Sequence, residues 1–438
     1  MRDVLRQKVV DSLAISPPPL TRRDVQLPSV RGKALAVIGM RRSGKTTFLW
    51  QCLGDRLANG APRESLLYLS FEDERLVGMH VSDLSWMIDE YFRLNPGMRD
   101  TRTATFFFDE IQTVNGWESF VRRLLDTEKV ELYLSGSSAR LLSREVATSM
   151  RGRALEVLIH PFSFRETLRH TGAEPNAPWE RLPKAVHSEL DHRLGLYLLE
   201  GGFPEAVGVP IRDRGALLRS YVDVVVLRDV IERHAVTNPV ALRWMQRHLL
   251  ANAAGYFSVQ KFYNDLRSQG IPVGKDTLHT YLGHLEDAFL VRTISLYSGS
   301  ERQRMVNPRK VYPVDPGLIP IYEKTGRLNL GHALETAVVV ELERRGRQIA
   351  YVRTREGFEV DFLATTSFHP PELIQVCLDI SDDATRKREV RALEAASKEF
   401  PHAKPLLLTF DSTPPRPPLP APLKWRPAAA WLLDRETP

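Results

Sequence analysis

Cysteine is scarce in this sequence, and long hydrophobic runs are absent. The two cysteines, Cys52 and Cys377, are far apart and too few for a disulfide framework or a zinc site. No run approaches the about 20 apolar residues needed to cross a bilayer. The charged start of the chain also lacks a secretory apolar core. These absences predict a cytoplasmic protein without a membrane partner.

A strong excess of one charge is also missing. The 438 residues carry 60 Lys and Arg against 54 Asp and Glu, which gives a formal net charge of +6. This dilute basic balance permits a polyanionic partner such as DNA but does not by itself indicate one. With 43% hydrophobic and 26% charged residues, the composition is that of a globular chain. The length predicts about three domains.

What the sequence does contain is a regular alternation over its first 160 residues. Short apolar runs of strand length are separated by intervals of helix length. These runs are Ala34–Ile38, Leu66–Ser70, Thr105–Phe108, Glu131–Leu134 and Ala154–Ile159. Because continuous apolar strands joined by helices form parallel sheets covered on both faces, we expect an α/β domain here.

A phosphate-binding loop follows the first of these runs. Residues 39–46 read G-x-x-x-x-G-K-T and precede a run that can form a helix. The glycines let backbone N–H groups turn toward phosphate oxygens, and the helix N-terminus adds its dipole. We expect Lys45 at the β- and γ-phosphates of ATP and Thr46 at Mg²⁺. The predicted nucleotide-binding residues are Gly39, Arg42, Ser43, Gly44, Lys45, Thr46 and Thr47.

Two carboxylates end the third apolar run. Asp109 and Glu110 directly follow Phe108, so a parallel sheet places them at the edge next to the phosphate loop. We predict that Asp109 holds Mg²⁺ and that Glu110 activates the attacking water. An ordinary acidic turn is the alternative, and the upstream loop favours the hydrolytic interpretation.

Three further residues are candidates for contacts with the γ-phosphate. Ser137 follows the fourth run, where a polar side chain can reach the phosphate or the water; a plain turn is the alternative. Arg151 and Arg153 precede the fifth run. Either can serve a neighbouring subunit as an arginine finger, and a solvated basic turn is the other interpretation.

Residues 235–325 have the spacing of a winged helix. Ser258 is a predicted N-cap, a turn follows at Gly270, and the next helix covers 275–287. Its apolar residues recur at helical spacing, which leaves a polar side for a DNA groove. Winged helices that bind proteins are the alternative. The predicted DNA contacts are Lys275, Thr277, His279, Arg302, Arg304, Arg309 and Lys310.

The order of the sequence blocks resembles that of a prokaryotic AAA+-like P-loop ATPase family with a C-terminal domain of unknown function. The blocks are GMRRSGKT, FFFDEIQTVNGWESFVRRLLD, YLSGSSARLLSREVATSMRGR, HPFSFRE, GGFPEAV and LIQVCLDISDDATRKREVRAL. The resemblance implies an ATPase core (1–160), a helical lid (161–234), a winged helix (235–325) and a PD-(D/E)xK nuclease-like α/β domain (326–438). It also implies a ring-like homo-oligomer, with a hexamer as the expected state.

The nuclease-like part departs from the pattern that the resemblance implies. Glu335 and Asp361 stand at the acidic positions that would hold magnesium. Gln375 stands where the next acid belongs, and Cys377 where the lysine belongs. Glutamine is a poor magnesium ligand compared with a carboxylate. Arg386 or Lys387 would be a weak replacement for the lysine, so we expect a DNA-binding module that does not cleave.

The sequence therefore predicts a Mg²⁺-dependent, oligomeric ATPase that acts on DNA. A motor that translocates or remodels duplex or branched DNA, as a helicase or by junction migration, uses all of these modules. A nucleotide-switched sensor or defence ATPase is the first alternative. A protein-remodelling ATPase is the second. Stimulation of ATP hydrolysis by DNA separates the motor from both.

Overall fold

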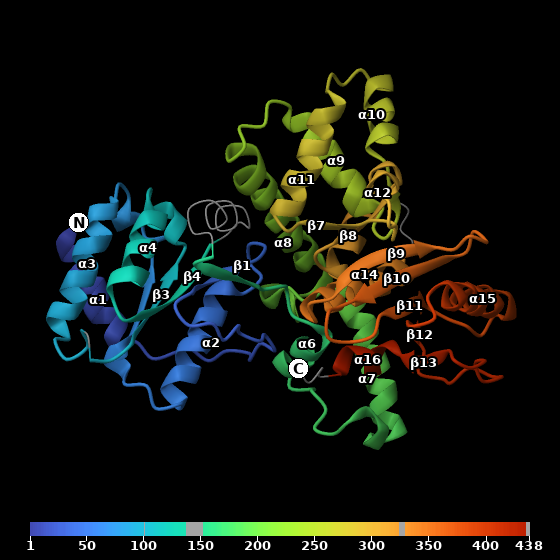
Figure 1. The fold of residues 1–438 in the computed structure, drawn as a ribbon, viewed down its shortest axis with the longest axis horizontal. Coiled ribbons are helices and arrows are strands. Elements are labelled where there is room, and N and C mark those ends of the chain that lie inside the picture. The colour runs from blue at the N-terminus through green and yellow to red at the C-terminus, as the bar shows by residue number, and fades with distance from the viewer. Residues whose placement is uncertain (100, 137–151, 324–328, 435–438) are drawn as a thin grey trace. The chain divides into compact units, whose positions relative to one another are not determined.

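The chain forms two compact units, residues 1–159 and 160–438 (Figure 1). The computed structural model describes residues 1–99, 101–136, 152–323 and 329–434. Ser137 and Arg151, both predicted to contact the γ-phosphate, lie outside these ranges. Within them, no helix is both long enough and apolar enough to span a bilayer.

The first unit is built on a five-stranded sheet. Its strands are β1 (Ala34–Ile38), β2 (Leu66–Ser70), β3 (Ala104–Asp109), β4 (Val130–Ser135) and β5 (Ala154–Leu158). They are ordered β2-β3-β4-β1-β5, and every neighbouring pair is parallel. The prediction of a parallel α/β sheet is confirmed, and β1 and β2 have the predicted bounds.

Helices cover both faces of this sheet, as the unbroken apolar strands require. Phe107 packs with Phe48 of α2, whereas Phe106 and Phe108 contact Tyr91 and Phe120 on the other face. The alternation of side chains along β3 thus distributes three consecutive phenylalanines between two cores. The helices are α1 (Arg2–Ala14), α2 (Lys45–Ala58), α3 (Val81–Leu94) and α4 (Trp117–Thr127), with 3₁₀ turns at Arg63–Ser65, Glu74–Leu76 and Ile111–Thr113.

The second unit begins with helices. They are α6 (Phe164–His170), α7 (Lys184–Glu200), α8 (Ile211–Val224) and a π-helical stretch (Val225–Glu232), with 3₁₀ turns at Trp179–Arg181 and Pro204–Ala206. Ser163 and Glu166 cap α6 reciprocally. Gly201 and Gly202 follow α7, and the buried Asp315 carboxylate accepts a 2.7 Å bond from the Gly202 N–H. A Cβ at residue 201 would lie 1.8 Å from Asp315, so this position requires glycine.

Residues 239–322 combine helices with a three-stranded sheet. The elements are α9 (Pro239–Ala251), β6 (Tyr256–Phe257), α10 (Val259–Ser268), α11 (Lys275–Asp287), β7 (Val291–Ile294), α12 (Glu301–Val306), β8 (Arg309–Pro313), a 3₁₀ turn (Pro316–Leu318) and α13 (Ile319–Tyr322). Strands β7 and β8 form an antiparallel hairpin, and β6 pairs with β8. Ser258 caps α10 by accepting from the Lys261 N–H, as its position predicts.

The C-terminal part is a five-stranded sheet that packs against three helices. Its elements are α14 (Leu330–Arg344), β9 (Gln348–Arg353), β10 (Glu359–Thr365), β11 (Glu372–Cys377), α15 (Asp383–Glu399), β12 (Lys404–Thr409), β13 (Lys424–Pro427) and α16 (Ala428–Leu433). The order is β13-β12-β11-β10-β9. Strand β10 is antiparallel to both β9 and β11, whereas β12 is parallel to both β11 and β13. Helices α6, α7 and α14 share one hydrophobic core with this sheet, and α15 packs in another.

Candidate active site

The phosphate loop joins β1 to α2 and has the backbone that its glycines permit. Gly39 has φ 145° and Gly44 has φ 99°. A Cβ at Gly39 would lie 2.2 Å from the carbonyl oxygen of Ile159, so only glycine fits there. Arg42, exposed in the loop, also has a positive φ of 67°. Thr47 is exposed in the first turn of α2.

Lys45 lies within this loop and is buried. Its ammonium donates to the carbonyl oxygens of Gly39 and Met40, at 3.0 and 3.1 Å. Ser43 is fully buried, and its hydroxyl has no hydrogen-bond partner among the residues that the structure describes. A loop with a lysine cation, a spare hydroxyl and the N-terminus of α2 fits a nucleotide phosphate.

Asp109 meets the loop at the end of β3, as predicted. Its Oδ2 accepts from the Thr46 hydroxyl at 2.8 Å and from the Tyr68 hydroxyl at 2.8 Å. Its Oδ1 accepts from the Ser135 hydroxyl. The structure thus brings together the threonine and the aspartate that the sequence assigns to magnesium. These oxygen donors fit a magnesium ion.

Glu110 occupies a left-handed backbone conformation, with φ 57° and ψ 41°. Its carboxylate accepts from the Gln112 amide, and its backbone N–H donates to Ser135 at 3.2 Å. Burial raises the pKa of the Glu110 carboxyl, while the Lys45 cation works against that shift. A raised pKa brings this carboxylate closer to the range in which a group can accept a proton from water.

Three contributors to this site were missed by sequence reasoning. Ser135, the last residue of β4, contacts both acidic residues. Its place at a strand end was a usable signal, because carboxyl ends of parallel strands meet at one edge. Tyr68 on β2 belongs to no sequence motif, so no pattern pointed to it. Arg23, which precedes the sheet, is buried and donates to the carbonyl oxygen of Ser43 at 2.9 Å, again without any signal in sequence spacing.

Of the two candidates for an arginine finger, the structure describes Arg153, which forms an ion pair with a residue of its own unit. Arg153 precedes β5, and its guanidinium forms an ion pair with Asp126 of α4. Both side chains are partly exposed. A finger role for Arg153 would require exchange of this partner for a phosphate, and it stays a prediction.

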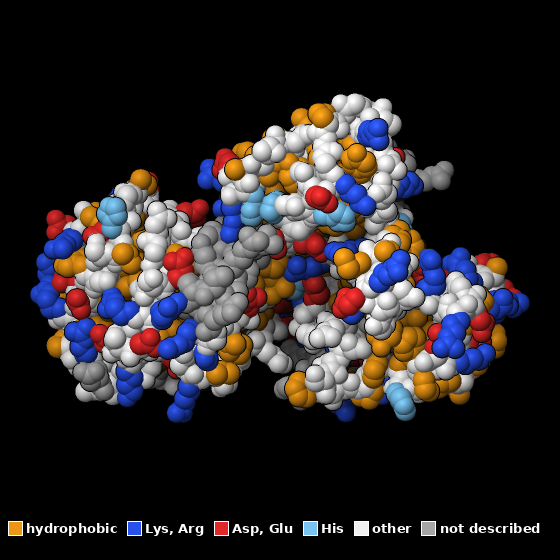
Figure 2. Space-filling view, turned by 45° about the horizontal axis from the view of Figure 1, so that its top comes forward, with side chains coloured by type: hydrophobic (Ala, Val, Ile, Leu, Met, Phe, Trp, Pro, Cys, Tyr) orange, Lys and Arg blue, Asp and Glu red, His pale blue; other side chains and the backbone are white. Residues whose placement is uncertain are grey.

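The residues predicted to contact DNA differ in their surroundings. Lys275 and His279 are exposed on α11, whose apolar face is buried as expected, and Thr277 is half-buried. Arg302 is exposed on α12. Over the visible face of the molecule, Lys and Arg side chains are interspersed with Asp and Glu (Figure 2).

Two of the predicted basic contacts have acidic partners nearby. Arg304 forms an ion pair with Glu301 one turn earlier in α12, at 2.5 Å. Arg309 lies 4.0 Å from a carboxylate oxygen of Glu286 and donates to Thr293. These pairs are partly exposed, so they are weak and can be exchanged for phosphate contacts.

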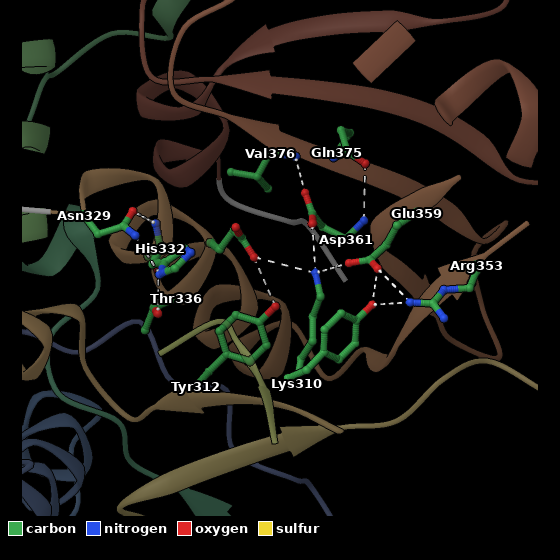
Figure 3. A network of polar contacts seen from close by, with 12 residues as sticks. Lys310, Tyr312, Asn329, His332, Thr336, Arg353, Glu359, Asp361, Gln375 and Val376 are labelled. Carbon is green, nitrogen blue, oxygen red and sulfur yellow. Dashed lines mark hydrogen bonds and ion pairs between the residues drawn. The ribbon is translucent and has the colours of Figure 1, made fainter. Parts of the chain in front are cut away.

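Lys310 is a correction to the sequence prediction, because it is buried rather than presented to DNA. Its ammonium lies 2.8 Å from Glu359, 3.1 Å from Asp361 and 4.0 Å from Glu335 (Figure 3). We call these four residues the Lys310 cluster. Burial alone would lower the pKa of Lys310, but the carboxylates, Asp361 foremost, outweigh burial and raise it. The nearby arginines suggested a basic wing, but β8 directs Lys310 toward the C-terminal sheet.

The other residues that depart from the nuclease pattern have partners close to them in the C-terminal part. Gln375 donates to Glu389 at 2.8 Å and accepts from the Asp361 N–H. Burial raises the pKa of the Cys377 thiol to about 11. Arg386 and Lys387 form ion pairs with Asp383 on their own helix, so neither enters the Lys310 cluster. Within the described ranges, no group of three His, Cys, Asp or Glu is arranged to hold a metal.

Similar proteins were found for most of the chain. Residues 31–168 match an AAA domain family (AAA_14), and residues 191–326 match a domain of unknown function (DUF8612). The uncharacterized protein MJ1544 of Methanocaldococcus jannaschii is 31% identical over 403 residues, which are 91% of this chain and 86% of that protein. An uncharacterized protein of Haemophilus influenzae is 31% identical over 329 residues, 75% of this chain and 78% of that protein.

A solved structure provides a weaker likeness. The Walker-type ATPase PABY2304 of Pyrococcus abyssi matches 74% of this chain and 95% of its own, at 15% identity and a TM-score of 0.40. A TM-score of that size does not define a common overall fold. The AAA match, by contrast, spans the phosphate loop, Asp109 at the end of β3 and Glu110 directly after it.

Proposed function

Because this chain belongs to the family of the M. jannaschii protein MJ1544 and carries an AAA-type P-loop ATPase domain, we propose that it is a Mg²⁺-dependent ATP hydrolase that acts on DNA. The observation that carries the hydrolytic part is the 2.8 Å hydrogen bond between Thr46 and Asp109 beside the phosphate loop. In ATPases of this type, the corresponding threonine and aspartate hold the metal together.

The residues of the site divide the chemistry of hydrolysis among them. Lys45 exchanges its bonds to loop carbonyls for the β- and γ-phosphates, and Ser43 offers its buried hydroxyl. Thr46 and Asp109 would hold Mg²⁺, which neutralises charge on the phosphates when bound. Glu110 receives the proton of the attacking water, and Gln112 orients its carboxylate until the water is in place.

The DNA part of the proposal is supported by α11 and the hairpin that follows it. Helix α11 buries an apolar face and exposes Lys275 and His279, and Arg302 is exposed on α12 between the strands of the hairpin. This is the order of elements in a winged helix whose second helix enters a DNA groove. Translocation or remodelling of duplex or branched DNA is the activity that would use hydrolysis and this surface together.

The deciding experiment measures steady-state ATP hydrolysis with Mg²⁺, alone and with single-stranded, duplex and four-way-junction DNA. We expect stimulation by at least one DNA structure. Glu110→Gln is the control, because it should bind ATP without hydrolysing it; normal turnover by this variant contradicts the role given to Glu110. Hydrolysis that no DNA changes would contradict the DNA part and favour a nucleotide-switched sensor or a protein-remodelling ATPase.

We also propose a ring-like homo-oligomer, with a hexamer as the expected state, in which Arg151 or Arg153 reaches the neighbour's γ-phosphate. Subunits carrying both Arg151→Ala and Arg153→Ala, and subunits carrying Lys45→Ala, are each expected to be inactive alone. Mixing them should restore part of the activity, because some boundaries then combine an intact loop with an intact finger. Full activity of Arg153→Ala alone would assign the finger to Arg151, and full activity of both arginine variants would contradict the shared site.

A further inference from the structure

Lys310 joins two parts of the second unit that are distant in sequence. It projects from β8 of the hairpin into a set of carboxylates carried by α14 and β10 (Figure 3). Its side chain is 6% exposed. A lysine is almost never buried to this extent unless carboxylates compensate its charge.

The carboxylates of the cluster are also occupied by other donors. Glu359 accepts from the Tyr256 hydroxyl, and Asp361 accepts from the Val376 N–H at 3.0 Å. Glu335 accepts from the Tyr312 hydroxyl at 3.2 Å. Two of these donors, Tyr256 and Tyr312, come from β6 and β8, so the same small sheet supplies both tyrosines and the lysine.

These donors leave the cluster poorly suited to a magnesium ion. The resemblance of the sequence to PD-(D/E)xK nucleases implies magnesium between Glu335 and Asp361. That ion needs several oxygen ligands in a near-octahedral arrangement. Asp361 instead accepts from the Lys310 ammonium and from the Val376 N–H. Glu335 accepts from the Tyr312 hydroxyl and lies 4.0 Å from the Lys310 ammonium. Gln375, at the next expected ligand position, donates to Glu389.

We propose that the Lys310 ammonium takes the place of a divalent cation and turns this acidic cluster into a closed ion-pair lock between the hairpin and the C-terminal sheet. The lock continues an existing connection. The Tyr297 N–H donates to Tyr351 at 2.7 Å, and the Tyr351 N–H donates to Ser295 at 3.1 Å, so the backbone after β7 is already paired with β9. The hairpin and the sheet therefore move as one body, and the domain does not hydrolyse phosphodiesters.

The three carboxylates of the cluster, Glu335, Glu359 and Asp361, line a cavity of about 720 Å³, so metal binding at them can be tested directly. The first test titrates the full-length protein with Mn²⁺ in the absence of nucleotide and assays cleavage of single-stranded, duplex and junction DNA. Wild type and Asp361→Asn should bind the same amount of Mn²⁺, and neither should cleave. Cleavage or a Mn²⁺ site that Asp361→Asn removes would overturn the proposal. Mn²⁺ that binds at the phosphate loop does so in both proteins, so it does not affect the difference between them.

The second test removes the tethered cation. Lys310→Met should gain one Mn²⁺ site, with affinity at least tenfold above wild type, and adding Asp361→Asn should abolish the gain. Lys387→Met is the matched control, because it removes the same charge from an exposed position on α15, and it should gain no Mn²⁺ site. A folded Lys310→Met without a new site would contradict the proposal. If Lys310→Met does not fold, the wild-type titration and cleavage assay still decide it.

Discussion

The phosphate loop and the Lys310 cluster contain the same kinds of residue and use them differently. Each places a buried lysine in a site that also contains carboxylates. Lys45 donates to two backbone carbonyl oxygens, which phosphates can replace, whereas Lys310 is surrounded by three carboxylates. Asp109, in turn, accepts from neutral hydroxyls, which yield to a metal more readily than an ammonium does. What the lysine is bonded to, rather than its presence, decides whether such a site can take a ligand.

The largest expected effect tests Lys45, whose bonds to backbone carbonyl oxygens phosphates can replace. Lys45→Ala should reduce ATP hydrolysis by at least about a hundredfold and weaken ATP binding, because a cation aimed at the phosphates is lost. Equilibrium binding of a fluorescent ATP analogue and steady-state turnover measure the two effects. The free energy of unfolding should change little by comparison. Unchanged nucleotide binding would remove the assignment of the loop.

Lys310→Met should show the opposite pattern. Removing one partner of a buried ion pair leaves uncompensated carboxylates, which typically costs about 3–5 kcal/mol. Chemical unfolding of the second unit should report this loss, while ATP binding stays near the wild-type value. Lys387→Met should stay within about 0.5 kcal/mol because its lysine is exposed. Equal free energies of unfolding for Lys310→Met and Lys387→Met would contradict the claim that Lys310 holds the cluster together.

Tyr68→Phe tests a hydroxyl donor on Asp109. Burial and the neighbouring Asp109 raise the pKa of Tyr68, so its hydroxyl keeps its proton and remains a donor. The Tyr68 hydroxyl has to leave the Asp109 oxygen before a metal binds there, so losing this hydrogen bond of about 1 kcal/mol predicts a roughly fivefold lower Mg²⁺ requirement for hydrolysis. Nucleotide binding without Mg²⁺ should not change. Tyr133→Phe is the matched control, since its hydroxyl contacts Arg56 instead. An equal shift in both variants would rule out a specific role for Tyr68.

Asp315 offers a third way to compensate a buried carboxylate, by hydrogen bonds from two backbone N–H groups and the charge of Arg344. It accepts from the N–H groups of Gly202 and Gly317, and burial raises its pKa from 3.8 to about 7. The folded state therefore binds the proton more tightly than the unfolded state. Stability from this group is complete below about pH 4 and is lost as the pH rises toward 7.

The change is measurable by urea unfolding across that range. Relative to Asp315→Asn, which cannot titrate, wild type should lose roughly 1 kcal/mol or more of unfolding free energy between pH 4.5 and 7.5. The difference between the two proteins isolates this group from all other titrations. Parallel pH profiles would mean that Asp315 stays charged throughout.

The parts of the molecule that depend on local spacing were predictable from sequence. The phosphate loop, the strands β1 and β2, the helix from Lys275 to Asp287 and the cap at Ser258 all follow from residues close together in the chain. The pairing of Asp109 with Thr46 followed from parallel-strand geometry. Such features are set by periodicity, caps and strand ends, which a single sequence displays directly.

Features that depend on long-range contacts were not predictable. Lys310 lies 51 residues from Asp361, and a basic neighbourhood in sequence suggested a surface wing. Tyr68 and Arg23 reach the nucleotide site from a neighbouring strand and from a segment ahead of the sheet. Neither residue belongs to a motif. In each case the partner is chosen by the tertiary arrangement, which leaves no trace in local spacing.

The position of Arg23 affects how the ATPase part can be isolated. The similarity to AAA domains begins at residue 31, so a fragment cut at that limit omits Arg23 and the whole of α1. It would lose the guanidinium that holds the Ser43 carbonyl and the helix that buries Leu5 and Val9. A recombinant ATPase fragment should therefore include α1 and Arg23. A fragment that begins at residue 31 would contain the whole phosphate-loop motif but would lack the Arg23 bond to the loop.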